Sequence, residues 1–530
     1  MGAEFEKTET EVPLRDSKPN GLMNTNLVDI PEVTWWKDPG LRTLYLMMPI
    51  LFLGSTMQGY DGSLLNGLQS SDQWQSYFNY PNGSELGLLS AIMGFGGFVA
   101  FFFSAPMADF LGRRLTVVIG VVILCAGVII QVVGDVSTGR FMGGRFLMGT
   151  GTNLASGSAP LLVVELAHPN HRGILATMYN GLWYLGAIVS SWTVFGTIKY
   201  EGEIAWRLPV ALQVLMPVIL ALFVYVFPES PRWLCSKDRP DEAFQILAKY
   251  HANGNVDDEF VQKEFYEIQE AIRMEKENSS ASWMALLRTP GNRKRTLLVV
   301  LTSVFSQCCG NSLVSYYISK ILNSVGITTS YDQTLINGCL TIWCFLDAVG
   351  CSLLVDKVGR KKLFMGAAVG MLISFSIWTG CSAAYAETGD KGAGSAVIAM
   401  IFIFYGASGL AFPGLTVSYC TEIMPYNLRA KGLALSIFVQ GLAGIFNVYV
   451  NPIGLENIQW KFYFVYIVVL VIFVICVKFL YVETKGTTLE EIARLFDGDG
   501  ALVPDIESKA AMAEQEEVEH EEHVVSAKVS

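Results

Sequence analysis

Twelve long apolar stretches govern what this chain of 530 residues can fold into. A helix needs about 20 mostly apolar residues to cross a bilayer, and most of the stretches are of that length. Their approximate ranges are 43–66, 86–107, 115–134, 141–163, 174–197 and 208–227 in the first half of the chain, and 295–322, 334–355, 363–385, 395–421, 432–452 and 461–481 in the second. Only 16% of the residues are charged, against about a quarter in soluble domains. The pattern predicts an all-α membrane protein with 12 transmembrane helices in two groups of six.

Polar segments divide the chain into five parts. Residues 1–40 are polar and acidic and contain no hydrophobic region of the signal-peptide type, so we expect a cytoplasmic N-terminal tail. The two groups of apolar stretches occupy 41–227 and 295–482, and a charged linker, 228–294, separates them. We expect residues 483–530 to form a cytoplasmic C-terminal segment with an acidic tail, whose many glutamates are typical of disordered chains.

The linker contains one clear helical pattern. Val261, Phe265, Ile268 and Ile272 recur at helical spacing, with charged residues between them. We therefore expect an amphipathic helix on the cytoplasmic face, which either braces the two halves of the protein or packs on nearby loops.

Three charged motifs occur twice, in the same order and about half a chain apart. The first is Asp109-Phe110-Leu111-Gly112-Arg113-Arg114, which returns as Asp356-Lys357-Val358-Gly359-Arg360-Lys361. The second motif is Glu165 with Arg172, which returns as Glu422 with Arg429. The third is Glu229 with the nearby Arg232, and its acid returns as Glu483. Such recurrence indicates an internally duplicated membrane protein.

We expect these charged motifs to form a cytoplasmic gate, in which the Glu165/Arg172 and Glu422/Arg429 sets make ion pairs with the Asp109 and Asp356 loops. The alternative is that the loops are merely solvated. The residues of the expected gate are Asp109, Arg113, Arg114, Glu165, Arg172, Glu229, Arg232, Asp356, Arg360, Glu422, Arg429 and Glu483.

The orientation follows from the loops that carry lysine and arginine. These loops alternate along the chain, so they share one side, which the positive-inside rule assigns to the cytoplasm together with both termini. The loop over 67–85 then faces outward and contains Asn82-Gly83-Ser84, an N-glycosylation sequon. We expect a multi-pass protein of the plasma membrane, surrounded by lipid, with a glycan on Asn82.

One carboxylate interrupts the first apolar stretch. Asp61 is costly to bury in a membrane, and such a residue usually marks a functional site with a partner. Arg145 opens the fourth stretch, on the same outward end in this topology. Burial and a neighbouring cation act in opposite directions on the proton affinity of a carboxylate, so an Asp61–Arg145 pair could exchange a proton as the protein changes conformation. A static structural ion pair is the alternative.

Neutral amides and aromatic residues within the apolar stretches suggest the kind of ligand. Amides both donate and accept hydrogen bonds with hydroxyl groups, and aromatic rings pack on the apolar face of a sugar. Each amide could instead form a helix–helix hydrogen bond. The candidate binding residues are Asn180, Trp183, Gln307, Asn311, Tyr316, Tyr405, Gln440 and Asn447.

The motif set resembles the sugar porter family of the major facilitator superfamily over about residues 40–497. The resemblance rests on Gly59-Tyr60-Asp61, the Asp109 loop, Glu165-x6-Arg172, Pro228-Glu229-Ser230-Pro231-Arg232 and Glu483-Thr484-Lys485-Gly486. Tyr60-Asp61-Gly62-Ser63, Asn180-Gly181-Leu182-Trp183 and Tyr419-Cys420-Thr421-Glu422 are similar to the fungal lactose permease and cellodextrin transporter branch.

The resemblance implies two six-helix bundles around a central cavity that works by alternating access. It also implies proton coupling, because passive facilitators of the family commonly carry Asn where this chain has Asp61. The family's Trp is replaced by Gly441 in the eleventh helix and, by spacing, by Val417 in the tenth. We expect these changes to leave room for a disaccharide.

The sequence thus predicts a monomeric, proton-coupled importer of a disaccharide such as lactose or cellobiose. A sugar sensor without useful flux, or a porter of a monosaccharide, polyol or other neutral solute, remains open. No catalytic triad, metal-ligand spacing or phosphate loop indicates an enzyme, and we expect neither a metal nor a cofactor apart from the coupling proton. The net charge of −11 does not favour nucleic acid as a partner.

Overall fold

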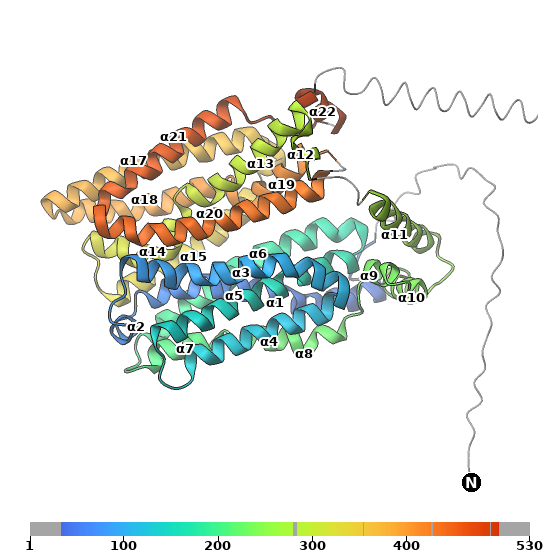
Figure 1. Ribbon diagram of the computed structural model, residues 1–530, viewed down its shortest axis with the longest axis horizontal. Helices are drawn as coiled ribbons and strands as arrows, with labels where there is room; N and C mark the ends of the chain where they lie inside the picture. Colours follow the sequence, from blue (N-terminus) through green and yellow to red (C-terminus); the bar gives the residue numbers. More distant parts are fainter. Residues whose placement is uncertain (1–32, 279–282, 353, 426–427, 488, 498–530) are drawn as a thin grey trace, which may run out of the picture.

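The computed structural model describes residues 33–278, 283–352, 354–425, 428–487 and 489–497. All regular structure in these ranges is helical. The long helices form two groups that lie side by side, one from each half of the chain (Figure 1).

The N-terminal bundle has six membrane-spanning elements. They are α1 (Pro39–Leu68), α3 (Gly83–Leu111), α4 (Arg113–Val132), α5 (Thr138–Leu166), α6 (Arg172–Thr197), and α7 (Ile204–Leu212) followed by α8 (Leu215–Phe223). A short helix, α2 (Asp72–Tyr77), joins α1 to α3. Buried aromatic residues such as Trp74, Phe141 and Trp206 pack in the core of this bundle.

The C-terminal bundle repeats this arrangement. Its spans are α13 (Pro290–Cys308) with α14 (Asn311–Ser324), α15 (Ser330–Ser352), α17 (Arg360–Thr388), α18 (Lys391–Gly409) with α19 (Phe412–Ile423), α20 (Arg429–Ile458) and α21 (Tyr463–Phe479). The short α16 (Val355–Val358) precedes α17, and α22 (Leu489–Asp497) follows the last span. Phe375, Trp378 and Tyr463 pack in a second core.

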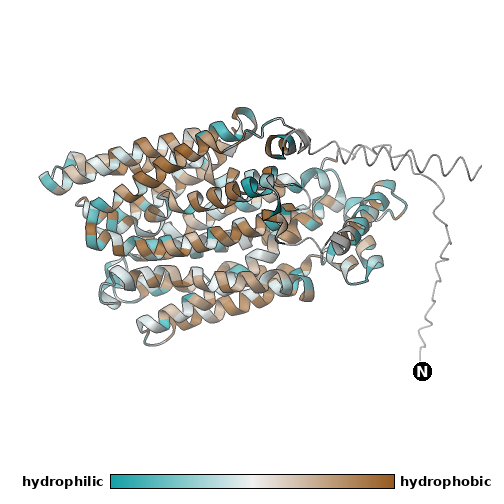
Figure 2. Cartoon of the chain, turned by 45° about the horizontal axis from the view of Figure 1, so that its top comes forward, coloured by the Kyte–Doolittle hydropathy of each residue, from teal (hydrophilic) through white to brown (hydrophobic). Residues whose placement is uncertain are grey.

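The twelve predicted spans are thus present, although their hydropathy differs widely. Nine stretches of the described chain are long and apolar enough to cross a membrane, and one of them, Arg429–Phe479, holds both α20 and α21. Counting these two separately, and adding the glycine- and serine-containing α5 and α6, gives all twelve. Hydrophobic residues colour the middle of the long helices and hydrophilic ones their ends (Figure 2). Large apolar side chains such as Phe103, Leu222 and Val468 are exposed on the spans, as lipid-facing residues would be.

Four helices form the described part of the linker at one end of the bundles (Figure 1). They are α9 (Pro231–Ser236), α10 (Pro240–His251), α11 (Glu259–Asn278) and α12 (Ala285–Arg288). The amphipathic helix predicted from Val261, Phe265, Ile268 and Ile272 is α11. Its apolar side packs on Leu247 and Phe244 of α10. The linker helices therefore pack on one another as well as on the bundle.

Two of the C-terminal spans are broken, and both breaks lie beside the interface between the bundles. The first lies between α13 and α14, where Gly310 has a φ of 109°. Only glycine adopts this conformation readily, and a Cβ at Gly310 would lie 2.9 Å from the ring of Phe375. The second separates α18 from α19 at Leu410 and Ala411. Interrupted spans are tolerated in membranes where they line a cavity.

Candidate functional site

A cavity of about 330 Å³ lies between the two bundles. α1 and α6 contribute its wall on one side, and α13, α14, α15, α18 and α19 contribute the other. Five of the predicted binding residues line it: Trp183, Gln307, Asn311, Tyr316 and Tyr405. The broken spans thus bring together residues that are far apart in the sequence.

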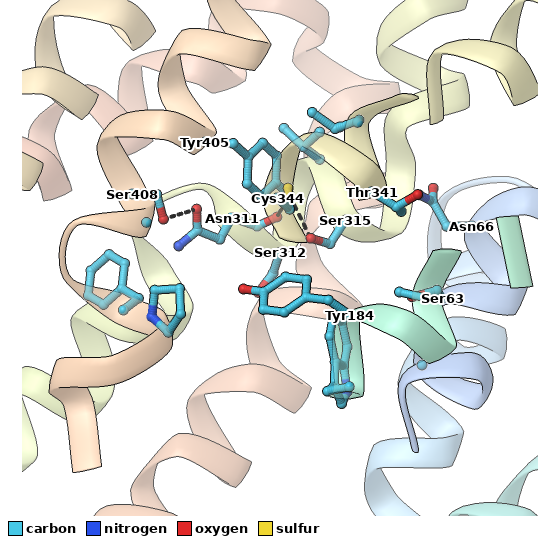
Figure 3. Close-up of a pocket in the computed structure, with 18 of the residues that line it drawn as sticks. Ser63, Asn66, Tyr184, Asn311, Ser312, Ser315, Thr341, Cys344, Tyr405 and Ser408 are labelled. Carbon is cyan, nitrogen blue, oxygen red and sulfur yellow. Dashed lines mark hydrogen bonds between the residues drawn. The ribbon is translucent and has the colours of Figure 1, made fainter. Parts of the chain in front are cut away.

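Asn311 begins the second half of the broken span and is held by its neighbours (Figure 3). Ser408 donates a hydrogen bond of 2.9 Å to the Asn311 side-chain oxygen, and the Tyr405 hydroxyl lies 3.0 Å from the Asn311 backbone carbonyl. Ser315 and Tyr405 share a further hydrogen bond of 2.6 Å. These contacts fix an amide and three hydroxyl groups on one wall of the cavity.

A second cavity of about 660 Å³ adjoins the first. Both are lined by Trp183, Tyr184, Gly409 and Pro413. Asn180 lines this second cavity together with Val417, one of the two positions where the family's Trp is missing. The route therefore continues from the central cavity toward the end of the bundles that carries the charged motifs.

The other predicted amides have different surroundings. Asn447 is buried, donates to the Gln307 backbone carbonyl at 2.6 Å and accepts from the Tyr466 hydroxyl at 2.8 Å. Gln440 donates to the Ser436 hydroxyl at 3.0 Å. Neither residue lines the two cavities. Through its bond to the Gln307 carbonyl, Asn447 instead positions the backbone of the broken span. Gly441, expected to enlarge the cavity, faces Phe98 of α3 instead.

Asp61 is fully buried inside the N-terminal bundle. Its carboxylate accepts hydrogen bonds of 2.9 Å from the Thr152 hydroxyl and from the Gln213 amide. The next residues along the chain, Gly62 and Ser63, line the central cavity. The acid is therefore one turn or less from the cavity wall.

Arg145 is also buried, with 2% of its surface exposed. A guanidinium N–H points at the Met93 sulfur, 3.7 Å away, and the Nε atom has no hydrogen-bond partner. Within the described residues Arg145 and Asp61 are not joined by an ion pair. The two charges share one bundle interior, and Thr152 and Gln213, which the sequence reasoning did not identify, are the direct partners of the acid.

Polar contacts between the bundles close the end of the cavity opposite the charged motifs. The Asn66 amide donates to the Asn337 side-chain oxygen at 3.0 Å, and Gln69 donates to the Tyr316 carbonyl at 2.9 Å. Lys320 of α14 donates to the side chain of Asn82, the residue that precedes α3. The expected glycosylation site thus takes part in this closure.

At the opposite end the duplicated motifs form networks. In the N-terminal bundle Arg113 binds Glu165 with N–O distances of 3.0 and 3.1 Å and Asp109 at 3.3 Å. Glu229 accepts the backbone N–H groups of Arg113 and Arg114. These contacts join the ends of α3, α4 and α5 to the segment before α9.

The C-terminal bundle repeats the network. Arg360 binds Glu422 at 3.0 Å, and Glu483 accepts the backbone N–H groups of Arg360 and Lys361 at 2.7 and 3.2 Å. Arg429 opens α20, and Arg232 lies in α9. The Asp356 side chain falls outside the part that the structure describes.

Arg172 differs from the expectation that it pairs with the Asp109 loop. Its guanidinium binds Glu264 of α11 at 2.9 Å. The same carboxylate meets His251 of α10 at 2.7 Å, and the other ring nitrogen of His251 lies 3.2 Å from the Leu166 carbonyl. These contacts fix the linker helices to the ends of α5 and α6. Arg172 therefore pairs with Glu264 of the charged linker instead of with the Asp109 loop.

The amino-acid sequence is similar to those of known transporters. A sequence model of the "Sugar (and other) transporter" family matches residues 47–496. The chain is 30% identical to the MFS-type transporter oryC of Aspergillus oryzae over 84% of each chain. It is 27% identical to the hexose transporter HXT13 of Saccharomyces cerevisiae over 86% of this chain and 83% of the relative.

Solved structures share the fold. The xylose transporter XylE from E. coli in an inward-open conformation aligns with a TM-score of 0.71 at 21% identity, over 86% of this chain and all of XylE. Its partially occluded inward-open form aligns with a TM-score of 0.68 at 20% identity, over 83% of this chain and all of XylE. Together with the duplicated motifs and the cavity between two bundles, these matches show that the chain belongs to the Sugar (and other) transporter family, the sugar porters of the major facilitator superfamily.

Proposed function

We propose that the protein is a proton-coupled importer of a neutral sugar, a disaccharide such as lactose or cellobiose, that works by alternating access. The observation that carries the proposal is the inter-bundle cavity, whose wall combines amides, hydroxyl groups and aromatic rings without a cation among its described residues. Hydroxyl-rich solutes exchange hydrogen bonds with such groups. Relatives named hexose and sugar transporters support a sugar as the solute.

The closed and open ends of the cavity support the transport cycle. Asn66, Asn337 and Lys320 hold the bundles together at one end, while the second cavity continues toward the other. Rocking of the two bundles would break the first set of contacts and bring the charged ends together. In the cell we place the charged end and both termini in the cytoplasm and the protein, as a monomer, in the plasma membrane with Asn82 outside.

Asp61 is the proposed proton carrier. Its carboxylate is withdrawn from water, is held by two hydrogen-bond donors, and adjoins the cavity through Gly62 and Ser63. A buried carboxylate that shares its bundle interior with a buried cation, Arg145, can gain or lose a proton when the bundles move. The proton:xylose symporter XylE, which shares this fold, supports this kind of coupling.

The test is uptake of labelled lactose and cellobiose by cells that lack other sugar transporters, with and without a protonophore. We expect accumulation that the protonophore abolishes. Uptake that only equilibrates and ignores the protonophore would replace the symporter with a facilitator. Absence of uptake of both sugars, with the protein shown at the cell surface, would refute disaccharide import and favour the sensor or another solute.

A further inference from the structure

A second acid interrupts the apolar stretches, and it lies in the cavity itself. Asp347 belongs to α15 and lines the central cavity. Among the described residues that line this cavity or the adjoining one, Asp347 is the sole charged side chain. A charge within a membrane span is costly and calls for a partner or a function.

The contacts of Asp347 leave most of its hydrogen-bonding capacity unused. The Cys351 thiol, one turn further along α15, donates to the carboxylate at 3.4 Å. It is the single hydrogen-bond donor to Asp347 in the described chain, and a thiol is a weak donor. An ionised carboxylate offers about four acceptor positions, so most of them remain for donors that enter the cavity.

The backbone opposite makes room for this carboxylate. Gly409 ends α18 at the break in the span, and a Cβ at this position would collide with the Asp347 carboxylate. The absence of a side chain at Gly409 therefore lets the acid stand at the cavity wall. Cys344 and Tyr405 line the same side of the cavity as Asp347, and Tyr184 of α6 lines the opposite side (Figure 3). Aromatic surface thus adjoins the Asp347 carboxylate, which in its ionised form can accept hydrogen bonds but cannot donate them.

We propose that the Asp347 carboxylate is a substrate-binding group that accepts hydrogen bonds from two hydroxyl groups of a neutral sugar and excludes anionic sugars from the cavity. The inference rests on the proposed function and adds a rule of selectivity to it. Charge-assisted hydrogen bonds are about twice as strong as neutral ones, so one carboxylate contributes much of the affinity. An anionic sugar would bring a second negative charge into a cavity whose described lining offers no cation.

The experiment measures sugar exchange in proteoliposomes, which needs no proton gradient. The probes are labelled lactose and lactobionate, an anionic derivative of the same disaccharide, as a competitor. For the unaltered protein we expect lactobionate to compete at least about tenfold more weakly than lactose. The variant Asp347→Asn keeps the size of the side chain but removes its charge. It should raise the half-saturation concentration for lactose about tenfold, as expected for a lost hydrogen bond to a charged group, and reduce the discrimination against lactobionate.

The matched control is Asp332→Asn, the same change at an exposed position at the start of the same helix. It should leave both values within about twofold. Equal competition by lactose and lactobionate in the unaltered protein would overturn the inference without any variant. An unchanged half-saturation concentration for the Asp347→Asn protein would also overturn it. If that protein had lost proton-driven accumulation alone, Asp347 would be a proton carrier and not a sugar-binding group. Failure of the unaltered protein to exchange any neutral sugar would instead overturn the proposed function, and this inference with it.

Discussion

The Glu483 carboxylate accepts a hydrogen bond of 2.7 Å from the backbone N–H of Arg360, at the residue where α17 begins. Glu229 caps α4 in the same way through the N–H of Arg113, at 3.2 Å. Negative charge at a helix N-terminus satisfies free N–H groups and the helix dipole. The duplicated sequence motifs are therefore duplicated caps, and each depends on the glycine that precedes its helix.

The glycine in the second cap gives the first prediction. Gly359 has a φ of 103°, and a Cβ there would lie 2.8 Å from a Glu483 oxygen. Gly359→Ala should lower the apparent Tm of the detergent-solubilised protein, because alanine in this conformation costs about 1–3 kcal/mol. Gly380→Ala, within the same helix and with open space around it, should keep or raise the Tm. A Tm for Gly359→Ala equal to that of the unaltered protein would show that the cap does not need glycine.

The second prediction concerns the proposed proton carrier. Asp61→Asn keeps the shape of the side chain but cannot bind and release a proton. It should abolish protonophore-sensitive sugar accumulation while sparing some exchange in proteoliposomes. Asp72→Asn, in the exposed first turn of α2, serves as the control. Full accumulation by the Asp61→Asn protein would exclude Asp61 as the carrier.

The third prediction separates two amides that the sequence treats alike. Asn311 lines the central cavity, whereas Gln440 binds Ser436 outside it. Asn311→Ala should raise the half-saturation concentration about fivefold for each sugar hydrogen bond lost, at about 1 kcal/mol each. Gln440→Ala should have a smaller effect in the same exchange assay. The opposite ranking would place the sugar nearer to Gln440 than the cavity suggests.

The fourth prediction concerns pH at the contact between the linker and the segment that joins α5 to α6. His168 is buried beside His251 and stacks on Phe260. Burial, assisted by His251, lowers the pKa of His168 from 6.5 to about 4. The unfolded chain therefore binds more protons between these pH values, and the free energy of unfolding should fall as the pH drops from about 6.5 toward 4.

Thermal unfolding at a series of pH values measures this effect. His168→Asn keeps a side-chain acceptor for the Asn170 N–H but does not titrate. Its Tm should fall less steeply with acidification than that of the unaltered protein. Parallel curves for the two proteins would assign the acid sensitivity to other groups.

The sequence predicted the fold better than the site. Length, hydropathy and repeated loops were sufficient for the two groups of spans, because these are properties of each segment alone. The partner of Arg172 could not be predicted, since Glu264 lies far along the chain in the linker and only packing of α11 brings it near. Asp109, in contrast, meets Arg113 only four residues further along the chain.

Site residues were harder because an amide in an apolar span serves a ligand or a neighbouring helix equally well. Asn447 holds the backbone of Gln307, whereas Asn311 faces the cavity, and helical periodicity does not distinguish these roles. Asp347 was missed, although the reasoning that singled out Asp61 applies to it equally. An acid in the stretch 334–355 was visible in the sequence alone.

The attachment of the linker has a mechanical consequence. Glu264 ties α11 to the base of α6, and His251 ties α10 to the end of α5. In a carrier that works by rocking, α10 and α11 therefore move as one body with the N-terminal bundle. A cross-link between α11 and the C-terminal bundle would stop the relative motion of the two bundles, and with it transport, without touching the cavity.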